Sequence, residues 1–81
     1  MKASVICIEG YWKDDRKSFE HRCVVMPKGA SDSMRDEILK EVRDDDVFYV
    51  FDEGEPIVGT HLDFVVEFYN PIYEIELGEV Q

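Results

Sequence analysis

The second half of the sequence lacks positive charge. No Lys or Arg follows Arg43, whereas eleven of the nineteen carboxylates lie between Asp44 and Gln81. Residues 1–40 are close to neutral, with eight basic and seven acidic side chains. The net charge of −10 therefore comes almost entirely from the second half, and such a surface repels nucleic acid and anionic lipid but attracts basic protein surfaces. We expect no direct binding to nucleic acid and no binding to a membrane.

Cysteine and long apolar runs are also scarce. Cys7 and Cys23 both lie in strand-like apolar stretches, where a reduced thiol acts as a small hydrophobic side chain. No apolar run is long enough to span a bilayer. The first residues lack the basic start, apolar middle and small-residue cleavage site of a signal peptide. These absences predict a cytoplasmic protein.

Sequence motifs for catalysis and cofactor binding are missing. The chain has no glycine loop that cradles phosphate, no nucleophile elbow and no dinucleotide fingerprint. His61 follows a Gly-Thr pair without a second partner, which favours a turn residue over a general base. We therefore predict that the protein is not an enzyme and uses no cofactor.

Two groups of residues resemble metal ligands in type but not in spacing. His21 and Cys23 alternate on one predicted strand and Cys7 lies on another, yet the pair spacings of zinc sites are absent. Residues 44–46 are consecutive Asp residues, without the alternation and central glycine of a calcium loop. Packing and a helix stop are the preferred interpretations, so no metal is expected. A small metal-dependent enzyme built on these residues is the weakest alternative.

The length allows one hydrophobic core, which predicts a single α+β domain over residues 1–81. Residues 3–9 and 18–26 predict a β-hairpin. The first of these runs does not alternate strictly, so it predicts a central strand covered on both faces. Residues 33–43 predict an amphipathic helix that begins in a capping box at Ser33. Its apolar stripe consists of Met34, Ile38, Leu39 and Val42.

The second half predicts strands only. Residues 47–51 have the strongest buried-strand composition, and residues 57–58 predict a short edge strand. Residues 62–69 and 72–77 predict an antiparallel hairpin that turns at Asn70-Pro71, with Glu67 opposite Glu74 and Phe68 opposite Tyr73. The expected fold is an antiparallel sheet of about four to five strands with one amphipathic helix packed on one face, in the order β-β-α-β-β-β.

The acidic second half and two aromatic side chains are the candidate binding residues. A row of carboxylates at strand spacing suits Lys and Arg on a partner, and an exposed aromatic pair beside a charged loop is typical of a contact hot spot. The alternatives are an acidic face that serves only solubility and an aromatic pair that packs over the hairpin end. The candidate partner-binding residues are Asp44, Asp45, Asp46, Asp52, Glu53, Glu55, Asp63, Glu67, Glu74, Glu76, Tyr11 and Trp12. We expect the carboxylates among them to form one continuous acidic surface.

These features predict a non-enzymatic acidic binding module or inhibitor that docks on a basic surface of a protein partner. A nucleic-acid-binding protein or complex is the leading partner class, because a basic groove built for phosphates also accepts regularly spaced carboxylates. In size and charge alone the chain is similar to the small acidic anti-defence inhibitors of viruses, and no family motif lies on it residue by residue. A self-associating structural or assembly protein, such as a homodimer whose acidity serves solubility, is the alternative.

Overall fold

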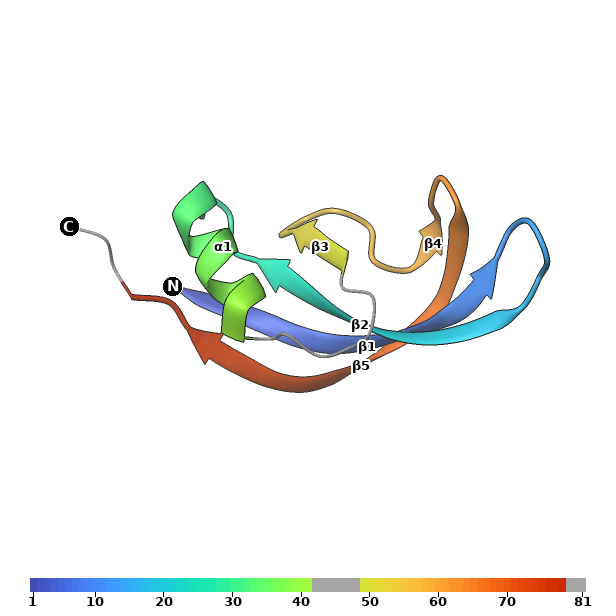
Figure 1. Ribbon diagram of the computed structural model, residues 1–81, viewed down its shortest axis with the longest axis horizontal. Helices are drawn as coiled ribbons and strands as arrows, with labels where there is room; N and C mark the ends of the chain where they lie inside the picture. The colour runs from blue at the N-terminus through green and yellow to red at the C-terminus, as the bar shows by residue number, and fades with distance from the viewer. Residues whose placement is uncertain (42–48, 79–81) are drawn as a thin grey trace.

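The structure is a computed structural model that describes residues 1–41 and 49–78 (Figure 1). Within these residues the chain forms a five-stranded sheet and one helix, which confirms the α+β class. The order in the sheet is β3-β2-β1-β5-β4, so β1 is central, as predicted. The elements are β1 (Lys2–Trp12), β2 (Ser18–Met26), α1 (Asp32–Glu41), β3 (Tyr49–Asp52), β4 (Gly59–Thr60) and β5 (Phe64–Glu76).

Strand β1 is buried on both of its faces. Val5, Ile6 and Ile8 are at most 3 % exposed, although Val5 and Ile6 are adjacent and must point to opposite sides of the sheet. Val5 belongs to a helix-end cluster and Ile6 to an aromatic cluster. The helix-end cluster comprises Ala3, Val5, Val24, Met26, Ile38 and Leu77, and the aromatic cluster comprises Ile6, Ile8, Phe19, Cys23, Phe51, Phe64 and Val66. The expectation of a strand covered on both faces is confirmed.

Helix α1 begins one residue earlier than predicted and is capped by a different serine. The Oγ atom of Ser31 accepts a hydrogen bond from the Met34 N–H at 3.3 Å, as an N-cap does. Ile38 is 1 % exposed, whereas Leu39 is 40 % exposed. The helix stands at one end of the sheet in Figure 1, and the structure does not show the predicted packing across one face. Val42 lies outside the described residues.

The sheet is mixed rather than antiparallel. Strand β3 pairs with β2 in parallel, and Tyr49 lies opposite Cys23. Parallel neighbours need a long crossover connection, and the chain segment that contains α1 supplies it. The predicted all-antiparallel sheet is therefore wrong, because the segment that contains α1 brings the chain back beside the middle of β2, and β3 then runs along residues 23–26 in the same direction.

Strand β5 is one strand of thirteen residues, so the predicted hairpin at Asn70-Pro71 is wrong. The whole strand pairs with β1, and Asn70 and Pro71 lie opposite Cys7 and Ile6. Two register shifts, next to Ile72 and to Glu67, let the strand follow β1 along its length. A tight turn with proline in second place is unfavourable, whereas β1 offers eleven partners. The predicted edge strand is also displaced, since β4 is formed by residues 59–60.

The described part of the chain contains no helix that is long and apolar enough to cross a membrane. The molecule is elongated, with extents of 46 × 26 × 20 Å, because β1, β2 and β5 run along its length (Figure 1). The helix lies at one end, and the loop between β1 and β2 forms the other end.

Candidate docking surface

Among the residues that the structure describes, most of strand β5 has a strand neighbour on one side only. Val65 and Val66 pair with β4 as well as with β1. From Glu67 to Glu76, no strand in residues 1–41 or 49–78 pairs with the outer side of β5. We call residues 67–76 the edge segment. Its outer backbone is available to another strand.

The edge segment carries large apolar side chains that remain in water. Phe68 is 55 % exposed, and Tyr69, Ile72 and Tyr73 are each 44 or 45 % exposed. Tyr69 lies opposite Ile8, while Phe68 lies opposite Glu9, so the two aromatic side chains point to different faces of the sheet. The exposed apolar side chains therefore flank the strand edge on both faces, and exposed apolar surface of this kind is typical of an interaction site. Sequence reasoning placed Phe68 and Tyr73 on the apolar face of a predicted hairpin and named none of the four as a binding residue, so it missed them.

A shallow groove runs beside the edge segment. It has a volume of about 360 Å³ and is lined by Tyr69, Pro71 and Ile72 of β5, together with Ile6, Val25 and Ile57. Its lining is mainly apolar, and Glu74 lies at its border. The groove can therefore accept an apolar side chain of a partner next to a carboxylate.

Three candidate carboxylates lie on the edge segment, and all three are exposed. Glu67 and Glu74 do not face each other as predicted, because they are separated by roughly 23 Å of the same strand. Glu74 and Glu76 lie opposite Ser4 and Lys2, on the side of the sheet that carries the groove. The Lys2 Nζ atom is 3.7 Å from an oxygen of Glu74, but both side chains are more than 60 % exposed, so solvent screens the pair.

Other candidate carboxylates are bound within the molecule. Asp52 forms an ion pair with Arg35 of α1. Glu53 accepts a hydrogen bond from the Lys28 N–H at 3.1 Å, and Glu55 accepts one from the Asp52 N–H at 3.4 Å. Asp52 at the end of β3 therefore binds the helix, and the two glutamates of the following loop bind neighbouring backbone N–H groups.

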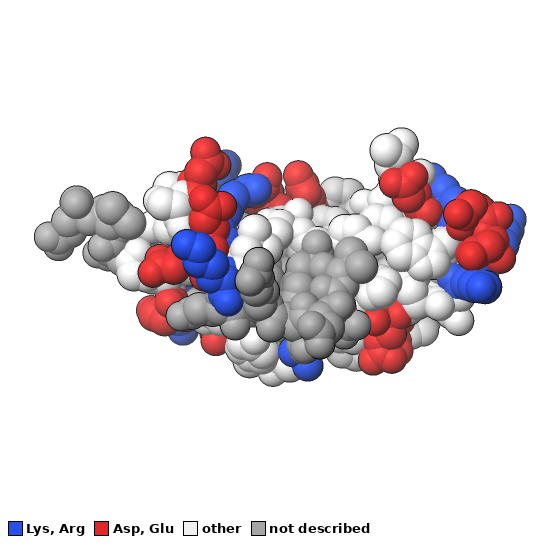
Figure 2. Space-filling model, viewed as in Figure 1, with Lys and Arg blue, Asp and Glu red and all other residues white. Residues whose placement is uncertain are grey.

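The described acidic side chains do not form one continuous field on the face drawn in Figure 2. They occur in several separate groups, and basic side chains lie among those at the two ends of the face. The candidate carboxylates at positions 44–46 lie outside the described residues. On the edge segment, Glu67, Glu74 and Glu76 accompany several exposed apolar side chains, and Asp63 follows Leu62, which is 89 % exposed.

Tyr11, Trp12 and Asp63 lie at the far end of the sheet from α1. The Trp12 ring packs on Phe19 and Phe64 at centroid distances of 5.1 and 5.9 Å, so it covers the aromatic cluster. The guanidinium of Arg16 lies 5.8 Å from the centre of the Tyr11 ring, and the Asp63 carbonyl accepts a hydrogen bond from the Lys13 N–H at 3.0 Å. These contacts give the three residues a role in shaping this end of the sheet.

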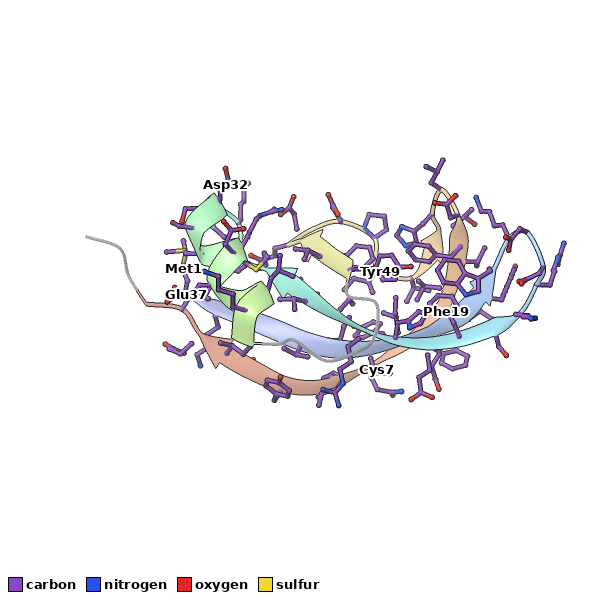
Figure 3. The ribbon with its side chains drawn as sticks, viewed as in Figure 1. Met1, Cys7, Phe19, Asp32, Glu37 and Tyr49 are labelled. Carbon is purple, nitrogen blue, oxygen red and sulfur yellow. The ribbon has the colours of Figure 1, made fainter. Side chains whose placement is uncertain are left out.

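The two thiols lie on opposite faces of the sheet. Cys23 lies opposite Ile6, whereas Cys7 lies opposite Arg22, and Figure 3 shows Cys7 on the side away from Phe19 and Tyr49. Burial raises the pKa of Cys23 to about 12. Partial burial and a hydrogen bond to Glu20 raise the pKa of Cys7. Both thiols are therefore protonated at neutral pH and are poor nucleophiles.

Neither histidine joins a ligand cluster in the described part of the chain. The His61 Nε2 atom lies 3.2 Å from the Ile57 carbonyl oxygen, and its ring stacks on Phe64 at 4.8 Å. The His21 ring lies 4.9 Å from that of Phe19. Among residues 1–41 and 49–78, no three His, Cys, Asp or Glu side chains are close enough to hold a metal ion.

Comparison with protein-family models found no match, and neither did comparison with curated proteins or with solved structures. No relative therefore supplies a function for the edge segment. Its geometry and charge are the available guides to what this protein binds.

Proposed function

We propose that this protein is an acidic binding module without catalytic activity, which docks on a basic surface of a protein partner. One observation carries the proposal: exposed carboxylates and exposed aromatic side chains lie together on the edge segment. Interface hot spots combine a large aromatic side chain with charges that exclude wrong partners. The edge segment has that composition, and its own half of the sequence has no Lys or Arg after Arg43.

The proposed partner is a cytoplasmic protein that handles nucleic acid. The surface of such a partner carries Lys and Arg that are placed to neutralise phosphates. Glu74 and Glu76 lie on one face of a rigid strand, about 7 Å apart, and can occupy such cationic positions. The cytoplasmic location accords with two thiols that are not joined to each other.

Charge reversal on the edge segment tests the proposal. We expect immobilised wild-type protein to retain basic proteins from a cell extract, with a loss of binding as salt is raised. The double variant Glu74→Lys, Glu76→Lys is expected to retain on the order of tenfold less of them. The matched control is Asp36→Lys, Glu37→Lys, which changes the net charge equally on the exposed side of α1. Equal losses in the two variants would refute a specific site on β5.

Self-association is a second candidate function, favoured by the exposed side chains Phe68, Tyr69, Ile72 and Tyr73. A dimer that covers them would bury aromatic surface on both copies. Light scattering over a range of concentrations separates the two functions. A stable dimer that persists at high salt supports self-association, and a monomer that binds basic proteins supports the docking module.

A further inference from the structure

The orientation of the backbone in the edge segment follows from one hydrogen bond at its end. The Leu77 N–H donates to the Met1 carbonyl oxygen at 2.8 Å, so the backbone of Leu77 points toward β1. In an antiparallel ladder, successive residues point alternately toward and away from a given neighbour. Ile75 therefore points toward β1, in line with its pairing to Ala3, and the backbones of Glu74 and Glu76 point outward.

The outward side offers a short stretch for pairing rather than a long one. Proline has no N–H group, so an added strand receives no hydrogen bond from Pro71. The register shift next to Ile72 interrupts the regular ladder directly after it. Residues 73–76 follow without interruption, and their outward N–H and C=O groups belong to the two glutamates.

The negative charge of residues 73–76 determines which kind of added strand can bind there. Glu74 and Glu76 would stand beside the residues of an added strand, where opposite charges stabilise a cross-strand pair and like charges destabilise it. A second copy of this chain, paired antiparallel about Ile75, would place Glu74 of one copy opposite Glu76 of the other. Pairing of two such edges is therefore disfavoured. A basic strand meets no such repulsion.

Apolar side chains next to the pairing stretch complete the pattern. Tyr73 is 45 % exposed, and the groove bordered by Glu74 is lined by Tyr69 and Pro71. A strand laid along the edge would place alternate side chains on each face of the sheet. Basic side chains would lie beside the two glutamates on the face that carries the groove, and apolar ones would lie beside Tyr73 on the other face.

We infer that the edge segment binds an extended basic segment of its protein partner by strand addition, through the outward backbone groups of Glu74 and Glu76. The bound segment alternates Lys or Arg with apolar residues. The inference rests on the proposed function and specifies the chemistry of the partner. Main-chain hydrogen bonds supply affinity in this mode of recognition, and the alternating side chains supply specificity.

The test uses the full chain and two short synthetic peptides. One peptide alternates Lys and Val, and the other has the same length and charge but contains proline in place of two valines. We expect the Lys-Val peptide to bind about tenfold more tightly, because proline cannot donate to the ladder. Amide hydrogen exchange measured by NMR is expected to slow by about tenfold at Glu74 and Glu76 when this peptide binds. Ile75 is the internal reference, since its backbone points toward β1.

Variants of the protein separate the inference from the proposed function. Glu74→Lys, Glu76→Lys is expected to lose the Lys-Val peptide, and Asp36→Lys, Glu37→Lys is expected to keep it. Equal binding of the two peptides, or binding without slower exchange at Glu74 and Glu76, would overturn strand addition and leave the acidic docking surface intact. Absence of peptide binding, while basic proteins are still retained through Glu74 and Glu76, would do the same.

Two further outcomes decide the remaining cases. If neither peptide binds and no basic protein is retained through the edge segment, the proposed function and the inference both fail. If the amides of Glu74 and Glu76 exchange slowly without peptide in a concentration-dependent dimer, the occupant of the edge is a second copy, and the basic-strand inference is overturned.

Discussion

Strand β5 has two parts that both carry large apolar side chains but have opposite surroundings. Phe64 and Val66 are 8 % and 1 % exposed, and this part of the strand has neighbours on both sides. Phe68 and Tyr73 of the edge segment are 55 % and 45 % exposed beside a single neighbour. An apolar side chain in a strand thus belongs to the core only if another element covers it, and otherwise it marks a surface that can bind.

The loop between β4 and β5 closes the first part. The His61 N–H donates to the Phe64 carbonyl at 2.8 Å, and the His61 ring stacks on that of Phe64. Trp12 and Tyr49 pack on Phe64 from β1 and β3, with the Tyr49 ring centre 4.7 Å away. Side chains from β1, β3 and the loop between β4 and β5 therefore pack on Phe64, whereas the aromatic side chains of the edge segment remain exposed.

Phe64→Ala tests the closed part of β5 with the largest expected effect. Truncation of this ring removes packing from the aromatic cluster, and we expect the free energy of unfolding to fall by about 3–5 kcal/mol. The matched change Phe68→Ala in the edge segment is expected to cost less than about 1 kcal/mol. Urea unfolding monitored by circular dichroism measures both values. Similar losses in the two variants would contradict the contrast between the two parts of β5.

Gly10→Ala tests how closely β1 and β5 approach each other beside the closed part. A Cβ atom at Gly10 would overlap the Val65 carbonyl oxygen, so the two strands would have to separate. We expect a loss of about 1–3 kcal/mol in urea unfolding. Gly78→Ala is the control, because a Cβ atom there meets no atom within 4 Å. An unchanged stability of Gly10→Ala would show that the strands are further apart.

Thiol labelling compares the two regions without changing the chain. Cys23 and Phe64 both belong to the aromatic cluster, whereas Cys7 lies opposite Asn70 of the edge segment. Because burial raises the pKa of Cys23 to about 12, we expect an alkylating reagent at pH 8 to modify Cys7 faster, by on the order of tenfold or more. Mass spectrometry of digested protein gives the two rates. Equal rates would mean that the aromatic cluster opens as readily as the edge.

Removal of the ion pair between Lys2 and Glu74 is expected to have the smallest effect. Both side chains are largely exposed, so Lys2→Gln should change the free energy of unfolding by less than about 1 kcal/mol. The control Lys40→Gln removes a charge from the last turn of α1. Urea unfolding at low and high salt measures both variants. A larger loss for Lys2→Gln would show that the edge segment is held in place by charge as well as by backbone pairing.

Local pattern identified most of the elements but misread β5. The unbroken apolar run around Val5 and Ile6 correctly predicted a central strand, because burial of adjacent residues requires cover on both faces. The segregation of faces around Asn70-Pro71 suggested a hairpin. The register shifts next to Glu67 and Ile72 break that alternation in β5, so that Val66 lies opposite Gly10 and Phe68 lies opposite Glu9, on different faces of the sheet. The exposed aromatic side chains of the edge segment were missed for that reason.

The sequence by itself determined that β2 and the helix form close to their predicted bounds, that β1 is buried on both faces, and that acidic charge is concentrated after Arg43. These properties depend on residue type and on spacing along the chain. Only the tertiary structure decided that β3 runs parallel to β2, that β5 pairs with β1 along its length, and that Glu74 and Glu76 turn their backbones outward. Every residue except proline offers the same backbone N–H and C=O groups, so the choice of strand neighbour depends on contacts between distant parts of the chain.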